Sequence, residues 1–499
     1  MSLKNTILKS LLSRNYKRIV QFRDNPVRTQ RRMLERVLSL GEGSSFAIDY
    51  EISSSTSYEE FARKVPIFDY DSFKPYIERM LSGERGVATR GVVRKFAKSS
   101  GTTADRSKFI PVTNISLRRN HMRGMRDVCA LYIAQFPDTN VLSGKILSLG
   151  GSCKKEGSVK VGDLSGLLMD WFKVGSGWLR APKLSTALIE DFDEKAQRII
   201  DECRDENITA FLGVPSWNMA LLSRLVEQSE GRSLKQIWPN LELFAHGGIE
   251  LSPYRSSLEH LYGGEGLRYM ESYNASEGFF AIADDISRGD MLLMLDYDTF
   301  YEFHEGDRVV PLWGVELGHT YALIISASNG LWRYEIGDRV RFTSIKPYRI
   351  KFAGRTRQFI NAFGEEVIVD NTDEALRLTC YQMQALTFDY SVAPRFMSLT
   401  RGGCHEWLVE FVRPPKDLEL FAARLDENLR NINSDYDAKR SSTMSPLELT
   451  SLRRGTLLRW MQRYGKSKIP RLSGERWIYE QIKLLNEQSD VYSNSRKYR

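Results

Sequence analysis

Five short stretches of the sequence combine residue types that could bind phosphates or a nucleotide. The first runs from Lys98 to Thr113 (KSSGTTADRSKFIPVT) and groups several hydroxyl side chains around Gly101. Hydroxyls and backbone N–H groups arranged in this way can form a concave nest for an anion. The spacing does not fit the Walker pattern, so this is not the loop of a P-loop NTPase. By itself it fits either a phosphate-binding loop or a solvated turn.

Two further stretches each place a carboxylate at the end of a predicted strand. In YNASEG, residues 273–278, a tyrosine ring can stack on a purine and Glu277 can hold Mg²⁺ near phosphates. By itself this stretch also fits a plain turn. In GLWRYEIGDRV, Asp338 follows Gly337 and can accept hydrogen bonds from both hydroxyls of a ribose.

The last two stretches are basic. FAGRTRQFI contains Gly354-Arg355, and GKSKIPR contains Lys466 and Lys468 just before a proline. An exposed lysine is usually only solvated, so neither stretch is informative by itself. Their order along the chain, together with the other three, carries more information.

That order resembles the layout of adenylate-forming enzymes. More specifically, the chain resembles the auxin-responsive acyl-acid amido synthetases, the Gretchen Hagen family, in a shorter, prokaryotic-type form. The matching landmarks, in sequence order from Ser99 to Arg471, are SSGTT…K, GVPSW, YNASEG, GLWRYEIGD, VDNTDEAL and KSKIPR. The phosphate loop departs from the family pattern, because it continues with Ala104-Asp105 where a glycine and a glutamate would be expected.

The resemblance implies a role for each landmark residue, with ATP and Mg²⁺ as cofactors. Two residues would be catalytic: Glu277 as the ligand of Mg²⁺, and Lys468 as the cation that reaches the reacting carboxylate and the α-phosphate. The other implied nucleotide-binding residues are Ser99, Ser100, Gly101, Thr102 and Thr103 at the phosphates, Gly247 and Gly248 beside the adenine, Tyr273, Asn274, Ala275 and Ser276 along the nucleotide, Asp338 at the ribose and Arg355 at a hinge.

The activity that the resemblance implies is that of an ATP-dependent ligase. It would convert a small carboxylic acid to its acyl-adenylate and transfer the acyl group to the amine of an amino acid. Two alternatives stay open: an acyl-CoA ligase that shares the first step, and a non-catalytic protein that binds nucleotide or acyl groups. The presence of Glu277, Asp338 and Lys468 together favours an enzyme.

The order of predicted elements indicates the fold class. Between residues 145 and 278, short apolar runs alternate with helical segments, which is typical of a mainly parallel sheet. Residues 291–342 form a β-ribbon pattern with a hairpin signal at Asn329-Gly330. We therefore expect an α/β protein with a large N-terminal domain, residues 1–354, and a smaller α+β C-terminal domain, residues 355–499. The resemblance implies that the first is an adenylate-forming domain and that the second is mobile.

Composition agrees with an ordinary globular protein of 499 residues, 42% hydrophobic and 27% charged. The net charge of +8 permits contact with nucleic acid or anionic membranes without requiring it, and basic residues cluster in 452–471 and in the final SRKYR. We expect no nucleic-acid or membrane partner.

The five cysteines are scattered and form no CxxC pair, which favours a reducing compartment and a cytoplasmic location. Residues 1–20 have apolar side chains at helical spacing, interrupted by lysines. We interpret them as a helix docked on the core rather than a membrane anchor. No apolar run elsewhere approaches transmembrane length.

Overall fold

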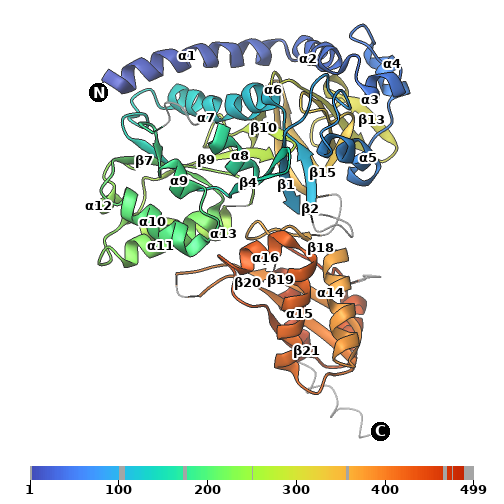
Figure 1. Cartoon of the computed structure of the whole chain (residues 1–499). Coiled ribbons are helices and arrows are strands. Elements are labelled where there is room, and N and C mark those ends of the chain that lie inside the picture. Colours follow the sequence, from blue (N-terminus) through green and yellow to red (C-terminus); the bar gives the residue numbers. More distant parts are fainter. Residues whose placement is uncertain are drawn as a thin grey trace, which may run out of the picture. The chain divides into compact units, whose positions relative to one another are not determined.

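The described residues of the computed structural model are 3–100, 107–171, 177–249, 251–355, 359–399, 401–464, 469–474 and 476–487. They fold as two compact units (Figure 1). The first unit is drawn from residues 1–99, 108–251 and 258–356, and the second from residues 100–107, 252–257 and 357–499. Each unit is described by itself.

One large mixed sheet runs through the first unit. From one edge to the other its strands are β13 (Arg308–Pro311), β12 (Thr299–Glu305), β14 (Thr320–Ala327), β15 (Tyr334–Ile345), β16 (Tyr348–Arg355), β11 (Met291–Leu293), β10 (Gly278–Ile282), β9 (Arg268–Ala275), β8 (Leu243–His246), β7 (Ile208–Gly213), β3 (Lys145–Ser148) and β6 (Arg180–Ala181). Strands β6, β3, β7, β8 and β9 are parallel, and the remaining neighbours pair antiparallel. The α/β fold class is therefore confirmed.

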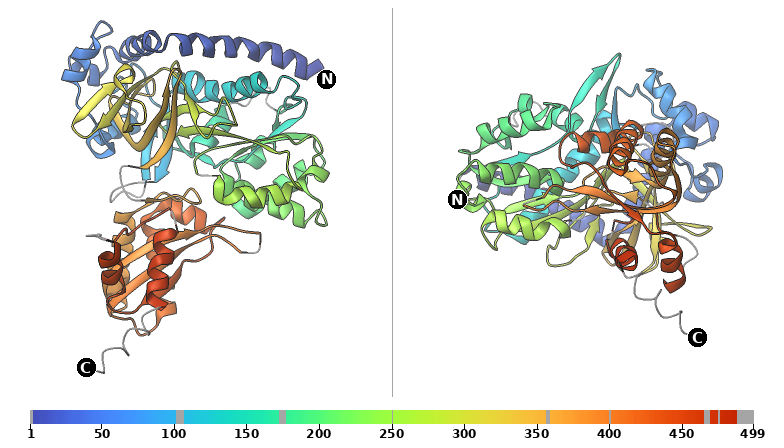
Figure 2. Two further views of the ribbon diagram at one scale, coloured as in Figure 1. Left: turned by 180° about the vertical axis from the view of Figure 1, so that it is seen from behind. Right: turned by 90° about the horizontal axis from the view of Figure 1, so that it is seen from below.

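The parallel strands alternate with helices, as the sequence predicts. The main ones are α10 (Phe192–Cys203), α11 (Pro215–Glu227) and α13 (Ser252–Tyr262). Helix α10 begins where the Asp191 side chain accepts a hydrogen bond from the Glu194 N–H at 2.7 Å, a standard N-cap. Its buried side chains recur at three- and four-residue spacing, so one face packs on the protein and the other is solvated. Figure 2 shows these green helices at the opposite end of the first unit from the blue helices α3–α5.

The antiparallel part contains the predicted hairpin. Strands β14 and β15 pair antiparallel around Asn329-Gly330. Gly330 has φ +94°, and a Cβ there would lie 2.7 Å from the Thr89 side chain, so this turn requires glycine. The apolar run 291–303 is not one continuous strand, however. It is divided into β11 and β12 by residues 294–298, where Asp298 has a φ of +50°.

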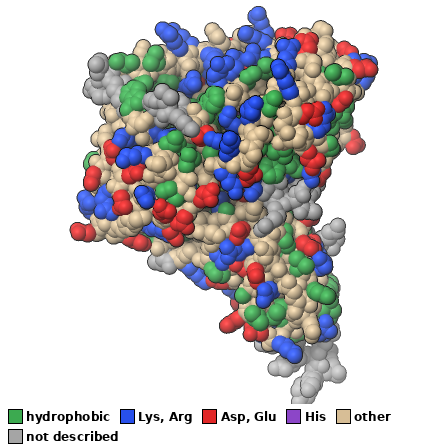
Figure 3. All heavy atoms as spheres, viewed as in Figure 1, with side chains coloured by type: hydrophobic (Ala, Val, Ile, Leu, Met, Phe, Trp, Pro, Cys, Tyr) green, Lys and Arg blue, Asp and Glu red, His purple; other side chains and the backbone are tan. Residues whose placement is uncertain are grey.

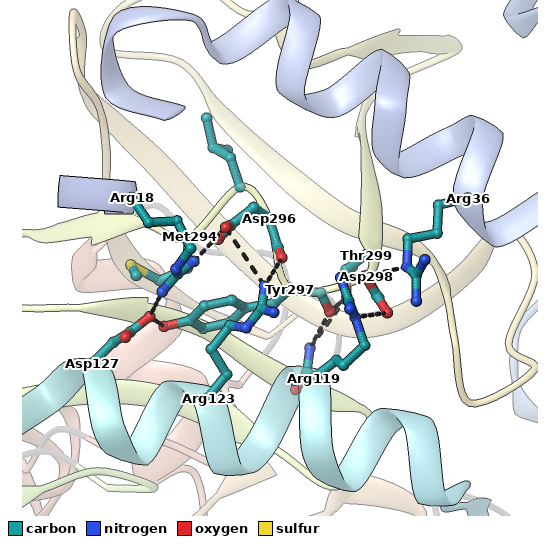
Figure 4. Close-up of polar contacts among 12 residues, drawn as sticks. Arg18, Arg36, Arg119, Arg123, Asp127, Met294, Asp296, Tyr297, Asp298 and Thr299 are labelled. Atoms are coloured by element: carbon teal, nitrogen blue, oxygen red, sulfur yellow. Dashed lines mark hydrogen bonds and ion pairs between the residues drawn. The ribbon is translucent and has the colours of Figure 1, made fainter. Parts of the chain in front are cut away.

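Buried charges explain that interruption (Figure 4). Asp298 has no exposed side-chain surface and pairs with Arg36 at 2.7 Å and Arg119 at 2.8 Å. Asp296 pairs with Arg18, which also pairs with the buried Asp127. The chain leaves the sheet here so that these carboxylates can reach guanidinium groups on three helices.

Those helices are α1 (Leu3–Asp24), α2 (Pro26–Gly41) and α7 (Met122–Gln135) with the π-helical turn η1 (Leu117–His121) before it. Helix α1 buries Ile19 and Phe22, and Leu8 and Leu12 pack partly buried against the same core. The docked helix that the sequence predicts is therefore confirmed.

The remaining elements of the first unit are short. They are α3 (Ser45–Asp49), α4 (Tyr58–Lys64), α5 (Tyr70–Leu81), α6 (Asn114–Ser116), α8 (Leu164–Trp171), α9 (Leu184–Ala187), α12 (Leu234–Ile237), the 3₁₀ turn Leu312–Gly314, and a small sheet in the order β2 (Ser107–Pro111), β1 (Lys95–Ser100), β5 (Val159–Gly162), β4 (Cys153–Glu156).

The second unit has a three-stranded sheet in the order β19 (Leu386–Arg395), β20 (Cys404–Arg413) and β21 (Glu448–Leu452). Its other elements are β17 (Phe359–Ile360), β18 (Val367–Ile368), α14 (Val369–Gln382), α15 (Leu418–Ile432), α16 (Ser434–Arg440), α17 (Thr456–Tyr464) and α18 (Trp477–Glu487).

Within the described ranges, no helix combines the length and the apolar character needed to cross a bilayer.

The buried ring of His121 makes the first unit acid-labile. It is 2% exposed, and burial lowers its pKa from 6.5 to about 4. Below pH 6.5 the unfolded chain therefore binds a proton that the folded chain does not, and stability falls until the pH reaches about 4. We expect this residue to account for a loss of up to about 3 kcal/mol across that window.

Urea unfolding at pH 7 and at pH 4.5 measures this effect. The variant His121→Leu should lose less stability on acidification than the natural chain, whereas the exposed-site control His260→Gln should behave like the natural chain. An equal loss in His121→Leu would contradict the assignment.

Candidate active site

Two glycines follow β8, at the carboxyl ends of the parallel strands. A Cβ on Gly247 would lie 2.3 Å from the backbone oxygen of Ser272 on β9, so no side chain fits there. The Ser272 hydroxyl donates to the His246 carbonyl at 3.1 Å. Gly248 has φ +85° and turns the chain away. The two glycines therefore let the backbone after β8 run directly against the end of β9, which is the kind of crevice where α/β sheets bind ligands.

The side chain of Tyr273, on β9, contacts Asp338 on β15. The phenol hydroxyl donates to Oδ2 of the carboxylate at 2.6 Å, and both residues are buried. Asp338 follows Gly337, whose φ is +89°, and the register of β15 against β16 shifts just after it. The irregular backbone thus directs this carboxylate toward β9, and two residues that the sequence singled out separately meet in one hydrogen bond.

The Tyr273 ring also forms part of an aromatic group. Its centroid lies 5.1 Å from that of Phe280 and 5.9 Å from that of Phe352. Phe352 is 43% exposed, so one face of this group is open to solvent. Aromatic faces next to a glycine-lined strand end suit a flat heteroaromatic ligand.

Glu277 lies in a two-residue turn between β9 and β10, because Ala275 pairs with Gly278. The Asn329 side-chain amide donates to the Glu277 carbonyl at 3.0 Å, which anchors this turn to the hairpin between β14 and β15. The Glu277 side chain is half-buried. A carboxylate is a hard oxygen ligand of the kind that Mg²⁺ prefers, so Glu277 in this turn is a candidate ligand for the ion.

Two neighbouring residues of this turn escaped the sequence analysis. The Asn120 side chain accepts from the Phe279 N–H at 2.7 Å, fixing the start of β10. Tyr334 is fully buried, and its pKa is raised well above 10 by burial, with a further contribution from the negative charge of Glu277. Asn120 carries no motif signal, and Tyr334 was read only as part of a strand.

The structure places seven of the predicted site residues at the ends of β8 and β9: Gly247, Gly248, Tyr273, Asn274, Ala275, Ser276 and Glu277. The eighth, Asp338, lies inside β15 rather than at the strand end that the sequence predicts, and the Tyr273 hydroxyl contacts it there. Of the others, Gly101, Thr102, Thr103 and Lys468 lie outside the described residues. Ser99 and Ser100 end β1, and Arg355 ends β16, where its backbone pairs with that of Asp338, but their side chains are not described.

Comparison with known protein families gives matches along most of the chain. Residues 15–165 and 150–267 match the GH3 family N-terminal domain. Residues 292–355 match the GH3 family central domain, and residues 370–476 match the GH3 family C-terminal domain. The central-domain match covers strands β12 to β16, among them β15, which carries Asp338.

Curated relatives agree with these matches. Indole-3-acetic acid-amido synthetase GH3.4 of Arabidopsis thaliana is 24% identical over 429 residues, which cover 70% of each chain. Indole-3-acetic acid-amido synthetase GH3.3 of the same plant is 24% identical over 514 residues, covering 86% of this chain and 85% of the relative.

Solved structures show the same fold at low sequence identity. AtGH3.15 acyl acid amido synthetase in complex with 2,4-DB superposes with a TM-score of 0.60 at 18% identity, over 96% of each chain. 2-Hydroxyisobutyryl-CoA ligase, in complex with 2-HIB-AMP and CoA, superposes with a TM-score of 0.58 at 14% identity, over 93% of each chain. At these identities the similarity concerns the fold alone.

The contact between Tyr273 and Asp338 can be tested by removing one hydroxyl. We expect Tyr273→Phe to lower the free energy of unfolding by about 1–3 kcal/mol, because a buried carboxylate loses a donor. We also expect it to weaken binding of an ATP analogue several-fold, measured by calorimetry.

Tyr262→Phe is the matched control, since its buried hydroxyl donates to the Leu241 carbonyl at 3.1 Å, away from these strand ends. It should reduce stability while leaving nucleotide affinity unchanged. Equal affinities in both variants and the natural chain would separate Tyr273 from the nucleotide site.

Proposed function

Because the chain belongs to the GH3 family, we propose that it is an ATP-dependent acyl-acid amido synthetase. It activates a small carboxylic acid as an acyl-adenylate and transfers the acyl group to the amine of an amino acid. The observation that carries this proposal is the hydrogen bond between Tyr273 and Asp338, next to the Glu277 turn and the glycines after β8. Family membership supports the reaction class, and this arrangement supports the nucleotide as its first ligand.

The reaction needs an activated acid because a carboxylate has no adequate leaving group for an amine to displace. A carboxylate oxygen attacks the α-phosphorus of ATP, and the bond to pyrophosphate breaks. The amino acid's amine then attacks the carbonyl carbon of the mixed anhydride, AMP leaves, and the amine loses a proton. Charge spreads over the phosphoryl oxygens in the first step, so cationic groups stabilise that transition state.

Different residues of this chain would bind different parts of the nucleotide. Asp338, oriented by the Tyr273 hydroxyl, would accept hydrogen bonds from the ribose hydroxyls. Gly247 and Gly248 leave room for the adenine beside β9. Ser99–Thr103 would contact the phosphates, and the segment from Tyr273 to Ser276 would line the nucleotide.

A metal ion and two basic residues complete the proposed site. Glu277 fits Mg²⁺ by its carboxylate chemistry and half-buried position, and the ion, when bound, would offset the charge of the phosphates. Lys468 would supply the cation at the reacting carboxylate and α-phosphate. We propose Arg355 as the hinge between residues 1–354 and a mobile domain of residues 355–499, whose movement would admit the amine after adenylation.

The cysteines support a cytoplasmic location. All five are free thiols: Cys129, Cys153, Cys203, Cys380 and Cys404. Burial raises the pKa of Cys203 to about 12 and those of Cys129 and Cys404 to about 11, so these thiols stay protonated and unreactive. We place the protein in a reducing compartment, without a disulfide framework.

ATP–pyrophosphate exchange tests the proposal directly. We expect exchange with one class of small aromatic or aliphatic carboxylic acids, in the absence of any amine or CoA, and loss of exchange when Mg²⁺ is chelated. Addition of amino acids should then yield an amide and AMP. Formation of a thioester with CoA instead would identify an acyl-CoA ligase. ATP binding without exchange for any acid would support a non-catalytic binding protein.

The proposed role of Lys468 predicts a selective defect. We expect Lys468→Ala to lower the rate of adenylation by about 10²–10³-fold, the size of effect produced by losing one electrostatic contact to a transition state, while ATP affinity changes little. Lys466→Ala, two residues earlier in the same basic stretch of sequence, is the matched control and should retain most activity. Wild-type exchange in Lys468→Ala would remove this residue from the mechanism.

A further inference from the structure

The net charge of the chain is concentrated in its first two helices. Residues 3–36 contain ten lysines and arginines but only two acidic residues, Asp24 and Glu35. This segment therefore carries a formal charge of +8, which equals the net charge of all 499 residues. The rest of the chain is balanced, with equal numbers of acidic and basic side chains. The sequence analysis placed the basic clusters only near the C-terminus and missed this one.

Folding brings these charges to one surface. Helices α1 and α2 follow one another along one side of the first unit, and Figure 3 shows lysine and arginine side chains gathered over them. The exposed ones are Arg14, Lys17, Arg28, Arg31 and Arg32. We call this surface the basic face.

Four partly exposed arginines extend the basic face toward α7 (Figure 4). The side chains of Arg18, Arg36, Arg119 and Arg123 are 23–35% exposed. Their acidic partners lie deeper, since the carboxylates of Asp127 and Asp298 are fully buried and that of Asp296 is 14% exposed. Because the acids lie beneath the guanidinium groups, the outer layer is cationic. The ion pairs also hold these side chains in place, which lowers the entropic cost of binding an anion.

Helix α1 adds apolar side chains to the same region. Ile7 and Leu11 are 52% and 55% exposed and lie one helical turn apart, and Arg14 follows on the same side. The neighbouring side of α1, with Ile19 and Phe22, is packed on the core. Exposed apolar residues beside basic ones, on a docked helix, are typical of helices that lie in the surface of a membrane.

We infer that the basic face is a docking surface for anionic lipid bilayers. The arginines and lysines contact phosphate and carboxylate headgroups, while Ile7 and Leu11 enter the headgroup region. This goes beyond the proposed catalytic function, and it revises the expectation of no membrane partner, which rested on the reading of residues 1–20 as a docked helix and on the lack of a spanning segment. A surface of this kind holds the enzyme at a membrane reversibly, and each basic side chain adds to the attraction.

The exposed apolar pair favours lipid over nucleic acid. A phosphodiester backbone attracts the same guanidinium groups, but it gives aliphatic side chains nothing apolar to bury against. A bilayer can bind the basic side chains through its headgroups and bury the apolar side chains at the same time.

Co-sedimentation of the full chain with vesicles tests the inference. We expect binding to phosphatidylcholine vesicles containing about one-third phosphatidylserine, no binding to pure phosphatidylcholine, and release as salt rises. A variant with Arg14→Gln, Lys17→Gln, Arg28→Gln and Arg32→Gln should bind at least about tenfold more weakly. Ile7→Ser with Leu11→Ser, which leaves the charge unchanged, should weaken binding by a smaller factor.

The matched control removes four exposed positive charges elsewhere, with Arg85→Gln, Lys155→Gln, Lys183→Gln and Lys416→Gln. It should bind the anionic vesicles like the natural chain. All variants should retain ATP–pyrophosphate exchange, so a failure of docking and a failure of the proposed reaction are separate results. Equal loss in the control, no binding to anionic vesicles at low salt, or binding of duplex DNA in place of vesicles would overturn the inference.

Discussion

The hydrogen bond from Tyr273 to Asp338 is the contact on which the candidate site depends. It joins β9, the last strand of the parallel part, to β15 in the antiparallel part, although three other strands lie between them in the sheet. A buried carboxylate that lacks a hydrogen-bond donor destabilises the fold. The parallel and antiparallel parts of the sheet must therefore keep the spacing and register that bring Tyr273 to Asp338. The glycines after β8, the Glu277 turn and the backbone of Arg355 are all positioned relative to this pair.

Much of the fold follows from local patterns in the sequence. Apolar runs that end in small residues mark β3, β7, β8 and β9, and the intervening helices show apolar residues at helical spacing. The Asn329-Gly330 turn is equally local. The break between β11 and β12 is not local, because Asp296 and Asp298 leave the sheet to meet arginines that come from α1, α2 and the turn η1. The sequence around a carboxylate does not show which distant residue it pairs with.

In the site, too, some features follow from the local sequence and others from contacts between distant strands. Tyr273, Glu277 and Asp338 stand out by residue type and motif, but their contact, and the support that Asn120 and Asn329 give to the turn, depend on pairing between distant strands. The basic face escaped notice for a different reason. Its charges are spaced along two helices with at most two adjacent in sequence, so inspection of runs does not reveal them. Only their helical arrangement makes them neighbours.

The ion pairs of α1 also constrain how the chain folds as it is synthesised. Arg18 and its partner Asp296 are 278 residues apart, and Gln30 donates to the Thr299 carbonyl 269 residues away. At ribosomal rates of roughly 5–20 residues per second, α1 and α2 wait on the order of tens of seconds for these partners. During that interval α1 can meet α7, where Asp127 also pairs with Arg18, but the contacts of both helices with residues 295–299 are missing. Helices α1 and α2 are therefore fully secured only long after their synthesis, and until then the side chains that will contact residues 295–299 are open to chaperones, proteases and aggregation.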